Sequence, residues 1–378
     1  MSESLKDLST IEYGASPKEI RSNDYTPIGI YGTGGLVGSA TKPLFHGPLV
    51  VVARKGTLDK PLYINGDCWV IDTAYAVLPN ANVDAKWLYY NLLKFDLKKL
   101  NESTGVPSIS RDYLYRVTFE TFALSEQRKI ARILSTVDAV IEKTEAVIAK
   151  YKAIKSGMLR DLFTRGIDLK TGKLRPSYED APELYKQSEL GWVPKEWEVV
   201  RIDELASMKS GEGITSKSIF DFAQYPVYGG NGLRGFTTMY THDGNYILIG
   251  RQGALCGNVN RVRGKFYASE HAVVVSVFNQ ISLGWLSQLL DEMNMNQYSE
   301  ASAQPGLAVS KILRLMVKKP QFDEQNEISK HLLSIDSKAQ IENKILYKYQ
   351  QLKFALMSDL LNGKVRVKYN EHIKLEAI

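Results

Sequence analysis

Two long segments of the chain carry a helical pattern of apolar residues. From Ser125 to about Thr164 there is no proline, and apolar side chains recur every three or four positions. The same pattern runs from Asp323 to about Asn362. This spacing is typical of an α-helix with one apolar face. About 38 residues at ~1.5 Å each give a helix of roughly 57 Å, so each helix needs a partner of similar length.

We therefore predict one helix over residues 124–165 and another over 323–363. Ser125 is a favourable N-cap for the first, and Gly363 predicts the end of the second. We expect the helices to pair antiparallel, because equivalent halves related by a pseudo-twofold axis would cross that way. In the alternative, each helix folds over the sheet of its own domain. The residues expected at the helix-pair interface are Ile130, Leu134, Val137, Ile141, Ile148, Tyr151, Ile328, Leu332, Ile335, Leu346, Tyr349 and Leu356.

The segment before each long helix has mixed character. The apolar runs 49–52 and 246–249 and the β-branched run 272–278 predict strands. Helical patterns surround Trp87 and Trp285. These features predict two compact α+β domains, a first domain over residues 1–123 and a second domain over 191–322. The polar stretch 166–190 is predicted to connect the first helix to the second domain, and 364–378 to be a frayed tail.

The two halves of the chain repeat one pattern. Tyr31-Gly32 recurs as Tyr228-Gly229 (228 − 31 = 197), and Glu126-Gln127 recurs as Glu324-Gln325 (324 − 126 = 198). A nearly constant offset along the chain indicates two homologous halves. The predicted fold class is therefore α+β, with two homologous globular domains separated by a long antiparallel two-helix coiled coil of pseudo-twofold symmetry. Two related but non-identical domains usually bind two related but non-identical targets.

Composition narrows the class of protein. The formal net charge is +6, which permits a polyanionic partner without requiring one. Cys68 and Cys256 are not related by the repeat, so we expect no shared metal or disulfide framework. The polar start of the chain does not resemble a signal peptide, and no apolar run approaches the roughly 20 residues that span a bilayer. We expect a cytoplasmic protein without a membrane partner.

Short matches to catalytic motifs do not survive comparison of the two halves. Gly230, Gly232 and Gly235 fit a dinucleotide-binding pattern, but a strand-like run follows them where that motif needs a helix. Asp72 with Asp84-Ala85-Lys86 resembles a nuclease carboxylate–lysine set, which the second half does not keep. The histidines form no pair with metal-ligand spacing. We expect a non-catalytic chain that binds no metal or cofactor itself.

Basic, amide and aromatic side chains recur in the glycine-rich loops and at the strand ends of both halves. Arg, Gln and Asn can make bidentate contacts to base edges, and Tyr and Ser suit phosphates. For any one of these residues, a solvated loop side chain remains the alternative. The candidate DNA-binding residues are Tyr31, Thr33, Arg54, Lys55, Ser108, Tyr228, Asn231, Arg234, Arg251, Gln252 and Gln304.

Three sequence features together resemble the DNA-specificity subunit of type I restriction–modification enzymes. They are the Glu-Gln start of each long helix (124–130 and 322–328), the connector motif Leu190–Pro194, and the Gly-Leu-x-x-Ser loop after Gln304-Pro305. The resemblance covers essentially the whole chain. The first half departs from it at 106–110, where it reads Val-Pro-Ser-Ile-Ser.

The resemblance implies a function. In that family, two target-recognition domains lie at opposite ends of an antiparallel helix pair. Each domain reads one half of a split, asymmetric site in double-stranded DNA, and the helices act as a ruler for the gap. Two modification subunits carry S-adenosylmethionine and methylate adenine, and restriction (translocase/nuclease) subunits join them. The alternative is a non-catalytic coiled-coil scaffold that joins proteins without DNA specificity.

Overall fold

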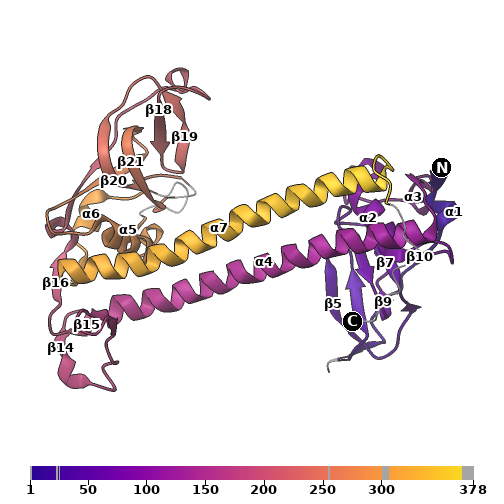
Figure 1. The fold of residues 1–378 in the computed structure, drawn as a ribbon, viewed down its shortest axis with the longest axis horizontal. Helices are drawn as coiled ribbons and strands as arrows, with labels where there is room; N and C mark the ends of the chain where they lie inside the picture. Colours follow the sequence, from indigo (N-terminus) through magenta and orange to yellow (C-terminus); the bar gives the residue numbers. More distant parts are fainter. Residues whose placement is uncertain (1, 23, 25, 254–255, 300–305, 368–378) are drawn as a thin grey trace. The chain divides into compact units, whose positions relative to one another are not determined.

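Two long helices connect two compact units of the chain. The computed structural model describes residues 2–22, 24, 26–253, 256–299 and 306–367. One unit comprises residues 1–146 and 343–378, and the other comprises residues 147–342. Helix α4 (Leu124–Thr164, 41 residues) passes from the first unit into the second, and α7 (Phe322–Leu361, 40 residues) passes back (Figure 1). The helices therefore run in opposite directions, and the predicted antiparallel pair is confirmed.

The first unit contains two sheets, with strand orders β2-β10-β7-β8 and β3-β5-β4-β9-β6, and a short pair β1-β11. The strands are β1 (Ser2–Ser4), β2 (Ser9–Tyr13), β3 (Arg21–Ser22), β4 (Gly29–Gly32), β5 (Gly35–Ala40), β6 (Phe45–His46), β7 (Leu49–Ala53), β8 (Leu62–Ile64), β9 (Asp67–Val70), β10 (Ala74–Pro79) and β11 (Thr118–Glu120). The helices of the domain are α1 (Leu5–Leu8), α2 (Ala85–Lys94), the 3₁₀ helix η1 (Leu97–Leu100) and α3 (Arg111–Tyr115).

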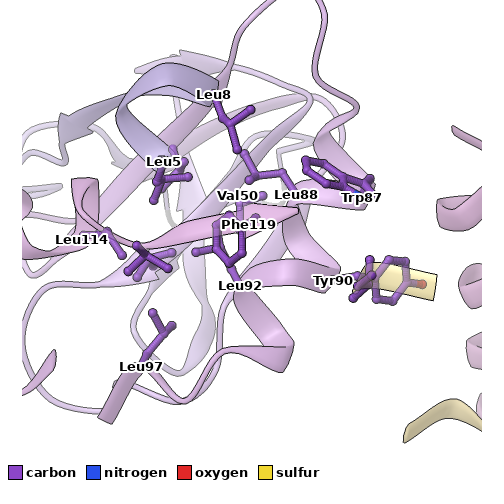
Figure 2. Close-up of a cluster of buried hydrophobic side chains, with 14 of the residues drawn as sticks. Leu5, Leu8, Val50, Trp87, Leu88, Tyr90, Leu92, Leu97, Leu114 and Phe119 are labelled. Atoms are coloured by element: carbon purple, nitrogen blue, oxygen red, sulfur yellow. The ribbon is translucent and has the colours of Figure 1, made fainter. Parts of the chain in front are cut away.

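The sequence of the central strand β7 is continuously apolar because the strand is buried on both faces. All five of its residues are buried, because the strand has a covered face on each side. Val50 and Val52 belong to the main core with Trp87 and Leu88 of α2, whereas Val51 faces a second cluster. Figure 2 shows Val50 among Trp87, Leu88 and other residues of the main core.

The second unit contains a six-stranded sheet of order β17-β22-β20-β21-β18-β19 and the pairs β12-β13, β14-β15 and β16-β23. Its strands are β12 (Ile167–Asp168), β13 (Lys173–Leu174), β14 (Tyr185–Ser188), β15 (Gly191–Pro194), β16 (Glu198–Arg201), β17 (Ala206–Ser210), β18 (Tyr225–Gly229), β19 (Gly232–Thr237), β20 (His242–Gly250), β21 (Val259–Ala268), β22 (Ala272–Val277) and β23 (Met316–Lys319). Its shorter helices are η2 (Pro182–Leu184), η3 (Ile202–Glu204), η4 (Ser216–Ser218), α5 (Leu283–Glu292), η5 (Met295–Tyr298) and α6 (Val309–Leu313).

The strand order shows the repeat in three dimensions. The run β2-β10-β7-β8 of the first unit corresponds to β17-β22-β20-β21 of the second. One difference lies in β21, which continues far enough to pair with β18 and so makes a single sheet. In the first unit, the corresponding stretch is interrupted between β8 and β9, and two sheets result.

The predicted helix-pair residues divide into two groups. Ile130, Leu134, Ile328 and Leu332 are fully buried, and they belong to the domain cores. The core that holds Ile130 also contains the α7 residues Met357, Leu360 and Leu361. Each long helix therefore packs on its own domain where it begins and on the other domain where it ends. The periodicity could not separate this core packing from a helix seam, because both need one apolar face.

The remaining predicted positions lie along the helices between the cores. Ile148 is buried, and Leu356 packs against the first core. The others are half-buried, which fits one face of a two-helix pair; they are Val137, Ile141, Tyr151, Ile335, Leu346 and Tyr349.

Two repeat-equivalent ion pairs join α4 to α7. In the first unit, Lys353 Nζ lies 2.6 Å from Asp138 Oδ1, and in the second, Lys155 Nζ lies 2.7 Å from Asp336 Oδ1. Asp138 also accepts a 2.7 Å hydrogen bond from the hydroxyl of Tyr90 in α2. These polar contacts favour one register of the two helices, which apolar stripes alone leave weakly specified.

The repeated glutamine near the start of each long helix fastens the helix to its own domain. The Gln127 side chain accepts a 2.8 Å hydrogen bond from the backbone N–H of Asp84 and donates to the carbonyl of Phe122. The Gln325 side chain makes the same two bonds, from Ser282 N–H and to the Pro320 carbonyl. Both glutamines are buried. Because a buried amide needs partners, these bonds hold each long helix against the start of α2 or α5.

The repeated glutamate binds the segment that follows the other long helix. Glu126 accepts two hydrogen bonds from the guanidinium of Arg366, beyond the end of α7. Glu324 accepts two from Arg175, beyond the end of α4, and one each from Trp197 Nε1 and the N–H of Ile167. The Glu324–Arg175 pair is buried, whereas the side chain of Arg366 is 67% exposed. In each unit, the Glu-Gln dipeptide therefore bonds the start of one long helix both to its own domain and to the segment that follows the other long helix. We call this set of bonds the junction.

Three local predictions differ from the structure. Ser125 is not an N-cap, because α4 begins at Leu124 and the carbonyl of Ala123 accepts from Glu126 and Gln127. The predicted boundary at residues 190 and 191 falls inside the β14-β15 hairpin, in which Tyr185 pairs with Pro194. The frayed tail is wrong for residues 364–367, which Arg366 ties to Glu126; residues 368–378 lie outside the described part. Gly363 does follow the end of α7, with a φ of +68°.

We expect Glu324→Ala to destabilise the protein strongly. The substitution leaves Arg175 buried without its main partner, and breaking a buried ion pair in this way costs about 3–5 kcal/mol. Equilibrium urea denaturation at pH 7 measures the loss. Glu126→Ala is the matched control, and we expect a clearly smaller loss because solvent screens the exposed Arg366. Equal losses in both variants would contradict this account of the junction.

Acid should weaken the junction of the first unit over a defined range of pH. The hydrogen bonds from Arg366 hold the pKa of Glu126 below its ordinary value of 4.5. A carboxylate whose pKa is lowered by folding stabilises the protein above its unfolded pKa, and this contribution is lost as pH falls through the folded value. The stability difference between wild type and Glu126→Gln should therefore be constant near neutral pH and shrink below about pH 4.5. Urea denaturation of both proteins across this range checks the sign, and a difference that grows on acidification would contradict it.

Candidate functional site

Four segments of the first domain meet at the end of its four-stranded sheet. The backbone N–H of Arg54 donates to the carbonyl of Thr73, and the N–H of Ile109 donates to the carbonyl of Arg54. Lys55 pairs with Ser108 in an isolated β-bridge. A side chain built on Gly56 would lie 3.6 Å from Thr33 Oγ1, so the β4-β5 turn also reaches this place. The structure therefore brings together four of the candidate DNA-binding residues, namely Thr33, Arg54, Lys55 and Ser108.

The second domain repeats this backbone arrangement. The N–H of Arg251 donates to the carbonyl of His271, and the N–H of Leu307 donates to the carbonyl of Arg251. Gln252 pairs with Gly306, as Lys55 pairs with Ser108. A side chain built on Gly230 would lie 3.0 Å from the carbonyl oxygen of Gln252, so the β18-β19 turn lies beside this loop. We call this set of bonded loops the loop frame of each domain.

In each domain, one glycine allows a fifth segment of the chain to pack closely beside the loop frame. A Cβ added to Gly14 would lie 2.1 Å from the carbonyl oxygen of Ile71, and one added to Gly211 would lie 2.3 Å from that of Ala268. Only a residue without a side chain allows this close approach. The close approach holds the end of β2 beside the first loop frame and the end of β17 beside the second. Because Tyr13 is the last residue of β2, it also lies beside the first frame.

The side chains on the two loop frames differ. The first frame carries Arg54, Lys55 and Thr33, whereas the second carries Arg251, Gln252 and Asn231 at the corresponding loops. Gln252 Oε1 lies 3.1 Å from His271 Nδ1, so the two side chains form a polar pair. Lys55, Gln252 and Asn231 are exposed, and the two arginines are half-buried. The chain thus presents the same backbone twice with different hydrogen-bonding groups.

The predicted tyrosines are placed differently from the basic residues. The Tyr228 ring packs edge-on against Phe266, 5.9 Å between centroids, and Tyr31 lines a cavity of about 480 Å³ with α2 and α4 residues. The Arg234 side chain lies over Gly229 on the β18-β19 hairpin. Gln304 lies outside the described residues. The sequence could not assign these side chains, because both faces of a glycine-rich hairpin are polar or aromatic.

Sequence reasoning missed Tyr13, Arg111 and, in part, His271. Tyr13 is remote from the motif loops along the chain, and only the fold places Tyr13 and Arg111 near Arg54. Arg111 could have been noticed, because it follows the Ser108–Ser110 loop directly. His271 contacts Gln252 and Glu270, so it is a hydrogen-bonded residue beside the second loop frame.

The residues that matched catalytic motifs have structural roles. Asp84 caps α2 by accepting from the backbone N–H groups of Lys86 and Trp87. Gly230 lies in the turn between β18 and β19, and Gly232 begins β19, so a strand rather than a helix follows that motif. Among the described residues, no group of three or more His, Cys, Asp or Glu side chains is placed to hold a metal ion. Every helix in the described ranges is too short or too polar to cross a lipid bilayer.

Comparisons with known proteins agree on one family. Residues 1–151 and 194–350 match the family model described as the type I restriction modification DNA specificity domain. The EcoprrI specificity subunit of Escherichia coli is 42% identical over 164 residues, which cover 42% of this chain and 40% of that relative. The MjaVIII specificity subunit of Methanocaldococcus jannaschii is 25% identical over 329 residues, 76% of this chain and 72% of the relative.

The fold also has a close counterpart among solved structures. The S subunit of a type I restriction–modification system from M. genitalium superposes with a TM-score of 0.70 at 17% identity, covering 96% of both chains. At this identity the likeness concerns the fold. The family model, in contrast, matches most of the sequence and both domains. The chain therefore belongs to the type I restriction modification DNA specificity family, with two DNA specificity domains on one polypeptide.

Proposed function

We propose that this chain is the DNA-recognition subunit of a type I restriction–modification complex and that each domain reads one half of a bipartite, asymmetric site. The observation that carries the proposal is the pair of loop frames. Their backbone hydrogen bonds are the same, and their exposed side chains differ. A constant scaffold with variable side chains suits two readers that dock on DNA in the same way but select different bases.

The side chains of the frames have the chemistry for this task. Arg pairs bidentately with guanine, and Gln and Asn pair with adenine, in the major groove. Lys55 and Ser108 suit phosphate oxygens, which position a protein without specifying sequence. The two half-sites should therefore share a docking geometry and differ in sequence.

We further propose that the helix pair sets the spacer between the half-sites. Two features support this role. Both helices are continuous over 40 residues or more, and the ion pairs Asp138–Lys353 and Lys155–Asp336 favour one register. A helix pair of defined length and register gives a spacer of defined length.

The expected partners are two modification subunits, and restriction subunits that join them. A related solved structure, similar to this chain in fold with a TM-score of 0.50, is described as showing complex assembly of the type I R-M system. Each unit of this chain contains the start of one long helix and the end of the other, so it offers the same kind of surface twice, which suits two copies of one partner. On this proposal, S-adenosylmethionine binds to the modification subunits, and this chain contributes no catalytic group.

The rival function is a scaffold without DNA specificity. The family match to a DNA specificity domain favours DNA recognition. DNA binding by the assembled complex across a salt series separates the two, because phosphate contacts make log affinity fall linearly with log salt. A complex that binds no DNA at low salt would overturn the proposed function.

Substitution of Arg251 and Gln252 should change specificity at one half-site. We expect Arg251→Ala and Gln252→Ala to weaken base preference at the half-site of the second domain by roughly 5- to 150-fold, the equivalent of one lost bidentate contact. Methylome sequencing of cells that express the chain with its modification subunit measures the preference at every position.

The matched control is the pair Arg54→Ala and Lys55→Ala, at the equivalent positions of the first domain. These variants should leave the second half-site unchanged. If Arg251→Ala lowers base preference at both half-sites equally, the residue has a general folding role, and the proposal that each domain reads one half-site is contradicted.

Shortening both helices should shorten the spacer. Removing residues 145–148 from α4 and the repeat-equivalent residues 343–346 from α7 shortens each helix by about 6 Å. At about 3.4 Å per base pair, we expect a spacer shorter by roughly two base pairs, with unchanged half-sites. Methylation mapping reads out both properties.

Deletion of 145–148 alone is the control. It shifts the helices against one another and separates Asp138 from Lys353 or Lys155 from Asp336, so we expect loss of folded protein. Altered half-sites with an unchanged spacer in the double deletion would contradict the ruler.

A further inference from the structure

Two arginines of the first domain lie over one tyrosine ring. Arg54 Cζ is 5.2 Å and Arg111 Cζ is 5.1 Å from the centroid of the Tyr13 ring. Arg54 directly follows β7, Arg111 begins α3, and Tyr13 ends β2. Three segments that are far apart in sequence therefore bring two guanidinium groups together, although like charges repel. We call these three residues the arginine–tyrosine cluster.

Several contacts hold the arginine–tyrosine cluster in place. Arg54 donates a 3.2 Å hydrogen bond to the carbonyl of Asp72. The Tyr13 ring packs edge-on against Tyr75, whose hydroxyl donates to the carbonyl of Ile109 in the loop frame. Arg111 Nε is shielded from solvent and, within the described ranges, makes no hydrogen bond. The two side chains are therefore ordered, and one of them retains an unused donor.

The cluster is accessible to a ligand at the loop frame. Tyr13 is 48% exposed, and both arginines are half-buried. Arg54 is also a member of the loop frame, next to Lys55 and its bridge to Ser108. A ligand that lies on the frame of the first domain would reach both guanidinium groups.

The second domain has no counterpart of this cluster. Under the repeat, Arg54 corresponds to Arg251, but Tyr13 corresponds to Ser210 and Arg111 to Val309. The backbone frame is shared, so the cluster is not needed to build the frame. Its chemistry belongs to what the first domain alone recognises.

We propose that Arg54 and Arg111 are the guanine-reading residues of the first domain and that Tyr13 is the positioning residue that holds their planes. This inference rests on the proposed function and adds the base identity to it. A guanidinium fork bonds bidentately to O6 and N7 of guanine, and this contact requires a fixed plane. The half-site of the first domain should therefore contain guanine at one or two positions, on either strand.

The same fork could bind a phosphate, but the structure favours a base. A phosphate contact needs charge and tolerates a mobile side chain, as the exposed Lys55 offers. Ordering two arginines on one ring costs side-chain entropy and brings like charges together. A bidentate contact to a base edge depends on the orientation of the guanidinium fork, so a fixed orientation can offset that cost there.

The test is selection of bound DNA from a pool of randomised duplexes, at fixed salt, by the full chain assembled with its modification subunit. The variants are Arg54→Gln, Arg111→Gln, Tyr13→Leu and Tyr13→Phe. Arg116→Gln is the matched control, because Arg116 ends the same short helix and lies over another ring, that of Tyr113. Thermal unfolding of each variant confirms that it is folded.

We expect Arg54→Gln and Arg111→Gln each to reduce guanine preference at a position of one half-site by about tenfold or more. Tyr13→Leu should broaden the same positions, and Tyr13→Phe should retain them, because the ring rather than the hydroxyl orients the arginines. Arg116→Gln should leave all positions unchanged.

Two other results would overturn the inference and leave the proposed function intact. One is a first half-site without guanine in the wild type. The other is a uniform loss of affinity at all positions with a smaller salt slope, which would identify Arg54 and Arg111 as phosphate contacts. A wild-type complex that selects no sequence would instead overturn the proposed function itself.

Discussion

The architecture depends on one buried junction that occurs in both units, the Glu-Gln dipeptide at the start of each long helix. The glutamine bonds to the backbone of its own domain, and the glutamate bonds to the segment beyond the other helix. Each helix is thus held where it starts and where it ends. Because buried polar groups need partners, the junction specifies one arrangement, whereas apolar packing alone would tolerate several.

Because this junction holds the long helices, the loop frames have no part in that task. The domain cores lie under α2 and α5, next to the long helices, whereas the loop frames lie at strand ends. The frames are built from backbone hydrogen bonds and from close approaches at Gly14 and Gly211. Their side chains can therefore change without loss of the scaffold.

The two frames show how far such divergence can go. The first carries an ordered pair of arginines on a tyrosine, and the second carries a glutamine bonded to a histidine. Both groups lie on the same backbone frame, but the two arginines offer only donors, whereas the glutamine and histidine offer donors and acceptors. On the proposed function, attraction to the phosphates would be common to both frames, and the difference would act on base selection.

The sequence by itself determined the repeat, the two long helices and their antiparallel pairing, because periodicity and offset can be read along the chain. It also nominated Thr33, Arg54, Lys55 and Ser108 as candidates, but only the tertiary structure brought them together. Only the tertiary structure decided that Ile130 and Ile328 are core residues, that Tyr228 packs inward, and that Arg366 binds Glu126. The same holds for Tyr13 and Arg111, which come from separate strands and helices. An apolar or aromatic residue has the same local signature in a seam, a core or a binding surface. Its neighbours across the fold, which the order of residues does not encode locally, decide among these roles.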